Sequence, residues 1–339
     1  MKVGKASELV LNRSVFKQIR HRRDEVILRP QVGVDASAIK VEEDEVITLS
    51  TNPIVCDVNK MGRIAVTEAV NNVVCSGATP VGVLTSIIIP IKSGEQTIKR
   101  LVHDIEETCV EYNIEILGGH TEYSINVNQP MINITGIGKI HKEAYLNPRK
   151  MEPGQEIVMT KWAGLEGTAE LATKKAEELK TKYANSFVEQ AKELTKYASV
   201  SKEAKIAMEL GVTAMHDLSE GGIFSGLWEF ANAGHVGFQV DLTQIPLKQE
   251  TIEVCEFFDL NPYMLLSTGS LLCVTSNANQ LVEELEKQGI KASVIGKLTQ
   301  GKERLVVNED ECRYLQPPKF DEIFKVTILG QEENLSKCK

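Results

Sequence analysis

The chain has 339 residues, of which 42% are apolar but only 5% aromatic, so it can bury full cores built from Val, Ile, Leu and Ala. Its net charge of -9 argues against general nucleic-acid binding, which favours basic surfaces. No apolar run reaches the roughly 18 residues that span a membrane, and residues 1–5 lack the apolar core of a signal peptide. The seven cysteines form no Cys-x-x-Cys pair, which is typical of a reduced, cytoplasmic protein.

The first elements lead from a predicted helix into strands. Residues 6–23 have a helical pattern, and their basic run 17–23 is either a solvated helix face or a contact for phosphates. A glycine turn with one carboxylate, Asp35, follows within residues 33–39. Residues 45–49 are typical of a strand. Residues 50–53, which carry hydroxyl and amide side chains, mark the end of that strand.

The second predicted helix, within residues 62–78, has two different faces. Apolar residues at helical spacing predict a core face, and Gly77 fits the helix end. The opposite face carries only small or acidic polar groups: Glu68, Asn71, Asn72 and Cys75. Because solvated faces usually carry Lys and Glu, this face suits contact with a ligand or another surface, although an ordinary surface helix is the alternative.

A central polar stretch follows the next strand and helix. Residues 81–90 predict a strand buried on both faces, and residues 95–112 an amphipathic helix. After a short strand, residues 114–117, the chain reads Gly-Gly-His-Thr-Glu at 118–122. Paired glycines at a strand end predict an exposed loop that approaches a ligand, with a solvated hairpin turn as the alternative. The strand 131–140 comes next.

Turn signals near residues 147–154 predict a boundary between two domains, 1–150 and 151–330, before a polar tail, 331–339. In the second half, a glycine turn at residues 164–168 opens a helix and is either an anion site or only a tight turn. A strand then runs into His216-Asp217, and the pair Gly221-Gly222 opens another helix. Asp217 is either a ligand or a helix cap.

Taken in order, these stretches resemble the AIR synthase-related, or PurM-like, superfamily over about residues 30–300, and HypE-like proteins most closely. The stretches that carry the resemblance are Gly33-Val34-Asp35-Ala36, Ser50-Thr51-Asn52-Pro53, Val70-Asn71-Asn72-Val73 with Gly77-Ala78, Gly118-Gly119-His120-Thr121 and His216-Asp217-Leu218-Ser219-Glu220-Gly221-Gly222. The segment from Asn261-Pro262 to Thr268-Gly269 also fits.

The resemblance implies a two-domain fold, with an N-terminal α/β domain whose sheet pairs with that of a second subunit in a homodimer, and a C-terminal α+β domain. It implies that ATP and magnesium lie in a cleft lined by these motifs, and that phosphate is attached to an amide, carbamoyl or carboxyl oxygen. A maturation partner protein would follow from likeness to HypE. The resemblance implies nucleotide-binding roles for Asp35, Asn52, Asn71, Asn72, Gly118, Gly119, Thr121, Gly221 and Gly222.

The chain departs from the family pattern at four acidic positions: 34, 52, one position in the Asn71-Asn72 pair, and 120. Magnesium prefers carboxylate oxygens, so we predict a relocated metal shell. Its candidate ligands are Asp35, Glu68, His120, Glu122 and Asp217, of which His120 and Asp217 are also the catalytic candidates. The Pro-Arg-x-Cys ending of HypE is not matched, because Cys338 precedes Lys339.

Three functions stay open on the sequence. The first is an ATP-dependent, HypE-like enzyme, and the second is a non-catalytic nucleotide-binding or regulatory dimer with a degenerate metal site. The third is an enzyme that uses a transition metal through His120.

Overall fold

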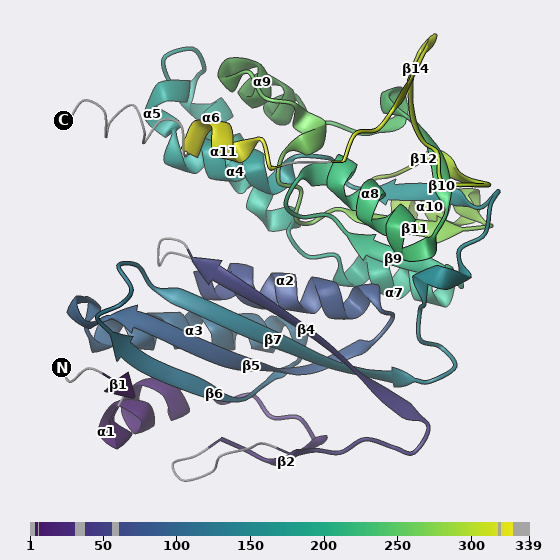
Figure 1. Ribbon diagram of the computed structural model, residues 1–339. Coiled ribbons are helices and arrows are strands. Elements are labelled where there is room, and N and C mark those ends of the chain that lie inside the picture. The colour runs from purple at the N-terminus through teal and green to yellow at the C-terminus, as the bar shows by residue number, and fades with distance from the viewer. Residues whose placement is uncertain (1–3, 6, 31–37, 56–60, 318–319, 328–339) are drawn as a thin grey trace. The chain divides into compact units, whose positions relative to one another are not determined.

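The computed structural model describes residues 4–5, 7–30, 38–55, 61–317 and 320–327 (Figure 1). Gly33, Asp35 and Cys338 lie outside the described residues. The chain forms two units, Met1–Tyr145 and Leu146–Lys339, and each is described by itself.

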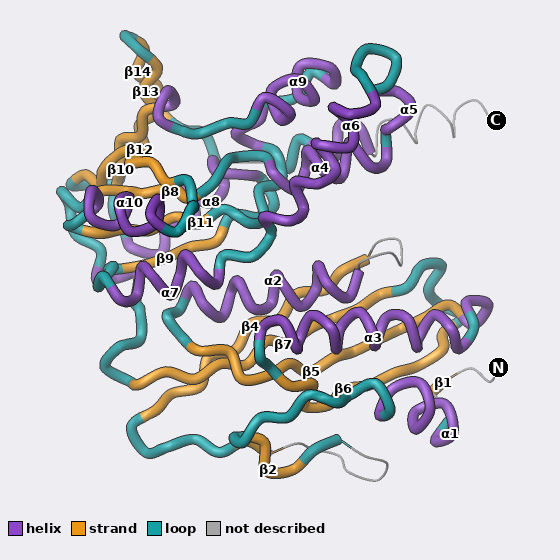
Figure 2. The backbone as a smooth tube through the Cα atoms, turned by 180° about the vertical axis from the view of Figure 1, so that it is seen from behind, coloured by secondary structure: helices purple, strands orange, loops and turns teal. Residues whose placement is uncertain are grey.

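The first unit is a five-stranded sheet with two long helices on one face (Figures 1 and 2). The strand order is β1-β6-β5-β7-β4, and β5 and β6 are parallel while the other pairs are antiparallel. Its elements are β1 (Gly4–Lys5), α1 (Glu8–Leu11), the π-helix η1 (Asn12–Phe16), β2 (Val26–Leu28), β3 (Ala38–Ile39), β4 (Glu45–Val55), α2 (Met61–Cys75), β5 (Thr79–Pro90), η2 (Ile91–Ser93), α3 (Glu95–Tyr112), β6 (Glu115–Ser124) and β7 (Met131–His141).

Glycines in β7 let α2 lie close to the sheet. A Cβ on Gly136 would lie 2.7 Å from the carbonyl oxygen of Ala69, and one on Gly138 would lie 2.4 Å from Cγ1 of Val73. Real Cβ atoms are not found at such distances, so only glycine permits this approach. The close packing fixes which face of α2 meets the sheet.

The predicted loop at residues 118–122 is wrong, because these residues continue strand β6. The register of β5 against β6 shifts between Val83 and Leu84, which makes the Gly-Gly pair part of an irregularity inside the sheet. Gly119 has φ +152°, and a Cβ there would lie 1.8 Å from the carbonyl oxygen of Thr85. The glycine thus serves strand pairing within the chain.

The predicted helix over residues 6–23 is also wrong beyond residue 16. Carboxylates of the neighbouring elements take the backbone donors that a helix would use. Glu106 on α3 accepts hydrogen bonds from the N–H groups of Arg20 and His21 at 2.5 and 2.7 Å, and Glu115 accepts one from Arg23 at 2.6 Å. The basic run is therefore attached to α3 and β6, not presented as a solvated helix face.

The second unit is a seven-stranded sheet with helices packed around it. The strand order is β14-β13-β10-β12-β8-β11-β9; β10 and β13 run parallel, and the other neighbouring strands of this sheet run antiparallel. Its elements are η3 (Pro148–Lys150), β8 (Glu156–Thr160), α4 (Leu165–Lys174), α5 (Ala176–Leu179), α6 (Asn185–Lys192), η4 (Glu193–Tyr197), α7 (Ser201–Glu209), β9 (Ala214–Asp217), α8 (Gly222–Gly234), β10 (Gly237–Asp241), η5 (Leu242–Gln244), α9 (Gln249–Phe258), η6 (Pro262–Met264), β11 (Leu271–Thr275), α10 (Ala278–Lys287), β12 (Ala292–Thr299), β13 (Arg304–Asn308), β14 (Glu311–Tyr314) and α11 (Ile323–Thr327).

The two largest apolar clusters among the described residues of the second unit hold it together. The larger cluster joins α8 to one face of the sheet through residues such as Phe230, Phe238 and Leu272. The other joins α4, α6, α9 and α11, with Leu171, Val188 and Val254 at its centre. The short C-terminal helix α11 is thus part of the folded unit and not of the polar tail.

Candidate functional site

The polar face of α2 is divided between the interior and a cavity edge. Asn71 is fully buried, so it is not on the open polar face that the helical pattern predicts. Asn72 is half-buried and donates a hydrogen bond from Nδ2 to the hydroxyl of Ser50 on β4, at 2.9 Å. Glu68 and Cys75 are half-buried, as is Asn52 on β4. Asn72 and Ser50 thus mark where α2 and β4 approach one another.

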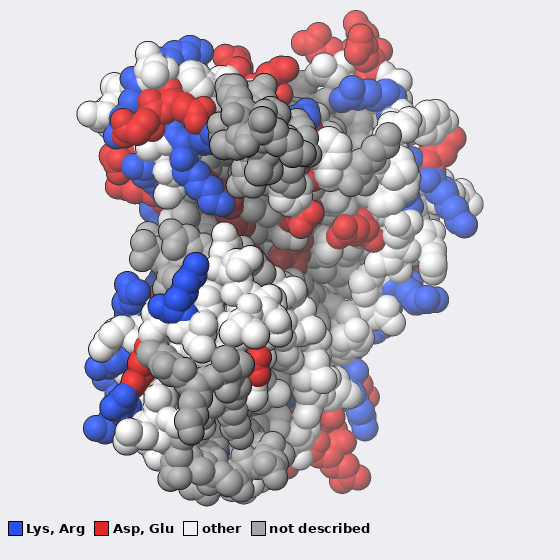
Figure 3. Space-filling view, turned by 60° about the vertical axis from the view of Figure 1, so that its left-hand side comes forward, with Lys and Arg blue, Asp and Glu red and all other residues white. Residues whose placement is uncertain are grey.

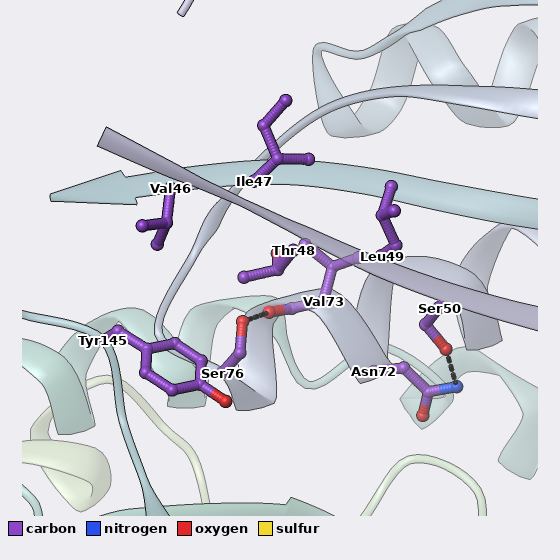
Figure 4. Close-up of a pocket in the computed structure, with 9 residues that line it drawn as sticks. All are labelled: Val46, Ile47, Thr48, Leu49, Ser50, Asn72, Val73, Ser76 and Tyr145. Atoms are coloured by element: carbon purple, nitrogen blue, oxygen red, sulfur yellow. Dashed lines mark hydrogen bonds between the residues drawn. The ribbon is translucent and has the colours of Figure 1, made fainter. Parts of the chain in front are cut away.

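A cavity of about 450 Å³ lies beside this pair (Figure 4). It is lined by Val46, Ile47, Thr48, Leu49, Ser50, Asn72, Val73, Ser76 and Tyr145. Ser76 donates its hydroxyl hydrogen to the carbonyl oxygen of Val73, and the Tyr145 ring lies near it in the view. The Thr48 hydroxyl is buried and makes no hydrogen bond within the described part of the chain. Apolar walls with a few polar groups suit a flat organic ligand.

His120 and Glu122 lie on the other face of the sheet. His120 is opposite Ser86 on β5, and its Nε2 is 3.1 Å from Oε2 of Glu122. The residues between and after them, Thr121 and Tyr123, are buried toward the helices, because side chains alternate along a strand. The face away from α2 and α3 is called the open face below. The two residues are therefore not beside Asn72.

Thr51, Asn133 and Thr135 also lie on the open face, where their side chains form a small hydrogen-bonded group. The Thr135 hydroxyl lies 2.9 Å from that of Thr51, and Asn133 donates from Nδ2 to the same hydroxyl at 2.9 Å. Leu84 is 38% exposed and Leu49 is 67% exposed on this face. Within one chain, the expectation that β5 is buried on both faces is therefore wrong at Leu84.

The predicted metal shell is not gathered by the residues that the structure describes. Across those residues, no group of three or more His, Cys, Asp or Glu side chains lies close enough to hold a metal ion. In the first unit, Glu68 lies on the helix side of the sheet, whereas His120 and Glu122 lie on the open face. The described side chains alone thus form no metal site built only from protein ligands.

In the second unit, Asp217 ends strand β9 opposite Leu271 and is half-buried. The turn after it carries Gly221 and Gly222, with φ of +77° and +62°, and leads into α8. The Gly221 N–H donates to a carboxylate of Asp321 at 2.6 Å. The α8 N-terminus therefore already has a negative partner from within the chain.

The glycine turn at residues 164–168 is likewise occupied by its own unit. Gly164 donates its N–H to the hydroxyl of Ser267 at 2.8 Å, and Gly167 donates to the carbonyl oxygen of Leu266 at 2.9 Å. Thr168 closes back on Gly164 through its hydroxyl. These bonds favour the tight-turn interpretation over the anion site.

Sequence reasoning missed a buried carboxyl in this turn. Glu166 has its Oε2 buried without a hydrogen bond in the described residues. Burial raises the pKa of Glu166 to about 7, the Thr268 hydroxyl acts in the opposite direction, and the charges of Glu170 and Asp321 raise it further. In the sequence, the glycine turn at residues 164–168 points to the region that contains Glu166, whereas no sequence pattern points to Asp321.

The surface charges do not form a uniform basic area on the face drawn in Figure 3, where Lys and Arg side chains alternate with Asp and Glu. In the predicted basic run, Arg20 pairs with Glu107 at 2.8 Å and Arg23 with Glu25 at 2.6 Å. No helix in the described residues is long and apolar enough to cross a membrane.

Comparison with known sequences matches both units. The N-terminal domain of AIR synthase related proteins matches residues 33–140, and the C-terminal domain matches residues 152–308. A Methanocaldococcus jannaschii protein named for hydrogenase expression and formation is 24% identical over 283 residues, which are 80% of this chain and 82% of that protein. The carbamoyl dehydratase HypE of Rhizobium leguminosarum is 24% identical over 276 residues, covering 78% and 77% of the two chains.

Solved structures share the fold. The hydrogenase maturation protein HypE in complex with ATP aligns with a TM-score of 0.78 and 19% identity, over 95% of this chain and 97% of that chain. HypE in a HypE–HypF complex aligns with a TM-score of 0.68 and 21% identity, over 80% and 90%. Two mixed α/β units of this kind define a PurM-like protein. The chain belongs to the AIR synthase related family.

Proposed function

We propose that the protein is a HypE-like ATP-binding protein that activates a carbamoyl group, or a related amide or carboxyl group, for dehydration. The observation that carries the proposal is the continuous match of both units to HypE, whose solved ATP complex spans nearly the whole of each chain.

The chemistry would proceed in two balanced steps. The carbamoyl oxygen attacks the γ-phosphorus of ATP, and the bond between that phosphorus and the ADP oxygen breaks. The carbon–oxygen bond then breaks and phosphate leaves while the carbon–nitrogen triple bond of a nitrile forms. The nitrogen gives up its two protons, one to the departing phosphate and one to solvent. Asp217 is the proposed residue for contact with the nucleotide in the second unit, and Asn52 and Asn72 are proposed for the first unit.

The cavity beside Asn72 is the proposed place for a flat part of a ligand in the first unit. Tyr145 and Val73 offer apolar contact, while Thr48 offers a buried hydroxyl with no hydrogen bond in the described residues. Gly118, Gly119 and Thr121 have structural roles in β6, and nucleotide contact by them remains a proposal.

Isothermal calorimetry with ATP tests the proposal, with magnesium and with manganese or zinc in parallel. We expect ATP to bind, and Asp217→Asn to weaken binding at least tenfold while circular dichroism stays unchanged. Asp310→Asn, which removes a carboxylate from the exposed turn between β13 and β14, is the matched control. Unchanged affinity in Asp217→Asn would remove this residue from the proposed nucleotide contacts. In the same comparison of metals, His120→Ala should lower the preference for manganese or zinc over magnesium, because the imidazole is the proposed transition-metal ligand.

A non-catalytic nucleotide-binding dimer is the second candidate, favoured by one observation. The described residues gather no group of three metal-ligating side chains. A turnover assay that follows phosphate release with a carbamoylated peptide separates the two candidates, because a regulatory protein would bind ATP without consuming it. A HypF-like maturation partner is proposed on the HypE–HypF structure alone.

We also propose a homodimer through the open face of the first unit's sheet. Leu84 and Ile88 lie on that face next to polar residues, which is typical of a surface that meets another protein. From the composition alone, we also propose that the protein is located in the cytoplasm.

A further inference from the structure

A fully buried carboxylate from the C-terminal segment holds the turn before α8. Asp321 is 0% exposed and lies beyond residue 308, where the family match ends. Its Oδ2 accepts a hydrogen bond from the Gly221 N–H at 2.6 Å, and its Oδ1 accepts one from the Ile323 N–H at 2.8 Å. One carboxylate therefore joins the C-terminal segment to the glycine pair.

The same segment is anchored a second time by the neighbouring residue. Oε2 of Glu322 accepts a hydrogen bond from the Asn261 N–H at 2.9 Å, and the Glu322 N–H donates to the carbonyl oxygen of Met264 at 3.2 Å. The Leu266 N–H also donates to Asp321. Burial nonetheless raises the pKa of Asp321, since it outweighs the three backbone donors. The anchor is thus built from buried groups, and its loss would leave several donors without partners.

A second buried carboxyl, Glu166 on α4, is joined to this anchor through the backbone. The N–H of the next residue, Gly167, donates to the carbonyl oxygen of Leu266 at 2.9 Å, and the Leu266 N–H donates to Asp321. Oε2 of Glu166 is buried without a hydrogen bond in the described residues. The charged groups near Glu166 are Glu170 on its own helix and Asp321, and Glu220 faces Asp321 from the turn. Thr268 is the neutral polar group beside Glu166. When Glu166 loses its proton, a second negative charge is added to a region that already buries one.

We propose that Asp321 is a positioning residue for the turn between Asp217 and Gly222, and that the protonation of Glu166 controls how firmly it holds that turn. Asp217 ends β9 four residues before Gly221, so fixing the Gly221 N–H restricts the conformations of the connection. A fixed turn lowers the entropy cost of binding at Asp217. This inference deepens the proposed function and rests on it for the nucleotide step.

Hydrogen exchange of the amides of residues 219–222, measured without nucleotide, tests the anchor directly. In Asp321→Asn one acceptor oxygen becomes an NH₂ donor that faces a backbone N–H, so we expect exchange at least tenfold faster. Glu322→Gln is the matched control, because it removes a charge from the same segment but keeps an acceptor for Asn261. Equal protection in Asp321→Asn and Glu322→Gln would overturn the anchor.

Calorimetry with magnesium-ATP tests the positioning role. We expect Asp321→Asn to weaken ATP binding about tenfold with unchanged stoichiometry, and Glu322→Gln to bind as the wild type does. If Asp321→Asn speeds exchange at residues 219–222 but binds ATP as tightly as wild type does, the positioning role is overturned. Absence of ATP binding by the wild type would overturn the proposed function and this nucleotide step together, whereas the exchange result would still decide the anchor.

The Glu166 step is tested by comparing Glu166→Gln with wild type at pH 6 and pH 8. Comparison at one pH cancels the intrinsic pH dependence of exchange. We expect the ratio of wild-type to Glu166→Gln exchange rates at residues 219–222 to rise about tenfold between these pH values, since a pKa near 7 falls between them. A ratio that stays constant would overturn the control by Glu166.

Discussion

At the scale of single residues, backbone geometry explains the glycine pair in β6 better than ligand contact does. Gly119 has φ +152°, and the carbonyl oxygen of Thr85 occupies the place of a Cβ. Any side chain would force β5 and β6 apart at their register shift. The constraint comes from strand pairing, which acts whether or not a nucleotide binds.

Gly119→Ala should therefore lower the free energy of unfolding by about 3 kcal/mol or more, because both the clash and the φ value oppose it. Urea denaturation measures the loss. Gly154→Ala is the control: its φ is +93°, but no atom lies within 4 Å of the added Cβ. We expect it to cost only about 1–2 kcal/mol. Equal losses in both variants would show that the clash at residue 119 is relieved by movement.

Glu166 should make stability depend on pH near neutrality. Its pKa is about 7 in the folded chain and near 4.5 when exposed, so the folded state holds the proton longer. The stability that this proton contributes is complete below about pH 4.5 and is lost as pH rises through about 7. At about 1.4 kcal/mol per pKa unit, the loss reaches about 3.5 kcal/mol at most.

Glu166→Gln keeps the neutral form at every pH. We expect its melting temperature to match that of wild type near pH 4.5 and to exceed it at pH 8. Differential scanning calorimetry at both pH values measures the difference, and other titrating groups cancel between the two proteins. A wild type as stable as Glu166→Gln at pH 8 would contradict the raised pKa.

At the scale of elements, buried glutamates attach the N-terminal segment to α3 and β6. Glu115 is fully buried, lies 2.7 Å from Arg29 and 3.7 Å from Arg22, and accepts the Arg23 N–H. Ser14 and Arg13 bind Glu95 in the same manner at the start of α3. These contacts pair the basic side chains of the N-terminal segment with carboxylates of the same chain. The basic run 17–23 is therefore a poor candidate for binding phosphates.

Glu115→Gln should lower the free energy of unfolding by about 3 kcal/mol, because it removes the buried member of an ion-pair group. Glu107→Gln is the control, since Glu107 pairs with Arg20 at 2.8 Å but is 52% exposed, and we expect less than about 1 kcal/mol. Limited proteolysis should cleave residues 17–29 faster in Glu115→Gln. Similar losses in both variants would mean that the buried pair contributes no more than a surface pair.

At the scale of the whole molecule, the open face predicts association of two chains. Leu84→Asp adds a charge at a position that is 38% exposed in one chain, so the fold should persist while a dimer dissociates. Light scattering at micromolar concentration should report a dimer for wild type and a monomer for this variant. Val110→Asp on α3, where Val110 is 46% exposed, should remain a dimer. A wild-type monomer would refute the proposed interface.

Much of the fold follows from the sequence because local patterns reflect burial. The amphipathic period over residues 95–112 predicts the bounds of α3 correctly, and the apolar run at residues 81–90 lies within β5. The ordered motifs predict the AIR synthase-related, two-domain fold, which the comparisons confirm. Roles of the predicted site residues stay predictions, with Asp35 outside the described residues.

Tertiary structure alone decided what the same local patterns left open. A Gly-Gly pair reads as a loop or as a strand irregularity, and only the approach of Thr85 selects the strand. Helical spacing cannot tell that Asn71 is buried, because burial on that side of α2 depends on which elements pack against it. Asp321 and Gly221 are far apart in the chain, so no local pattern predicts their hydrogen bond. Sequence patterns record the periodicity of burial along a segment, whereas contacts between segments depend on how the segments are packed.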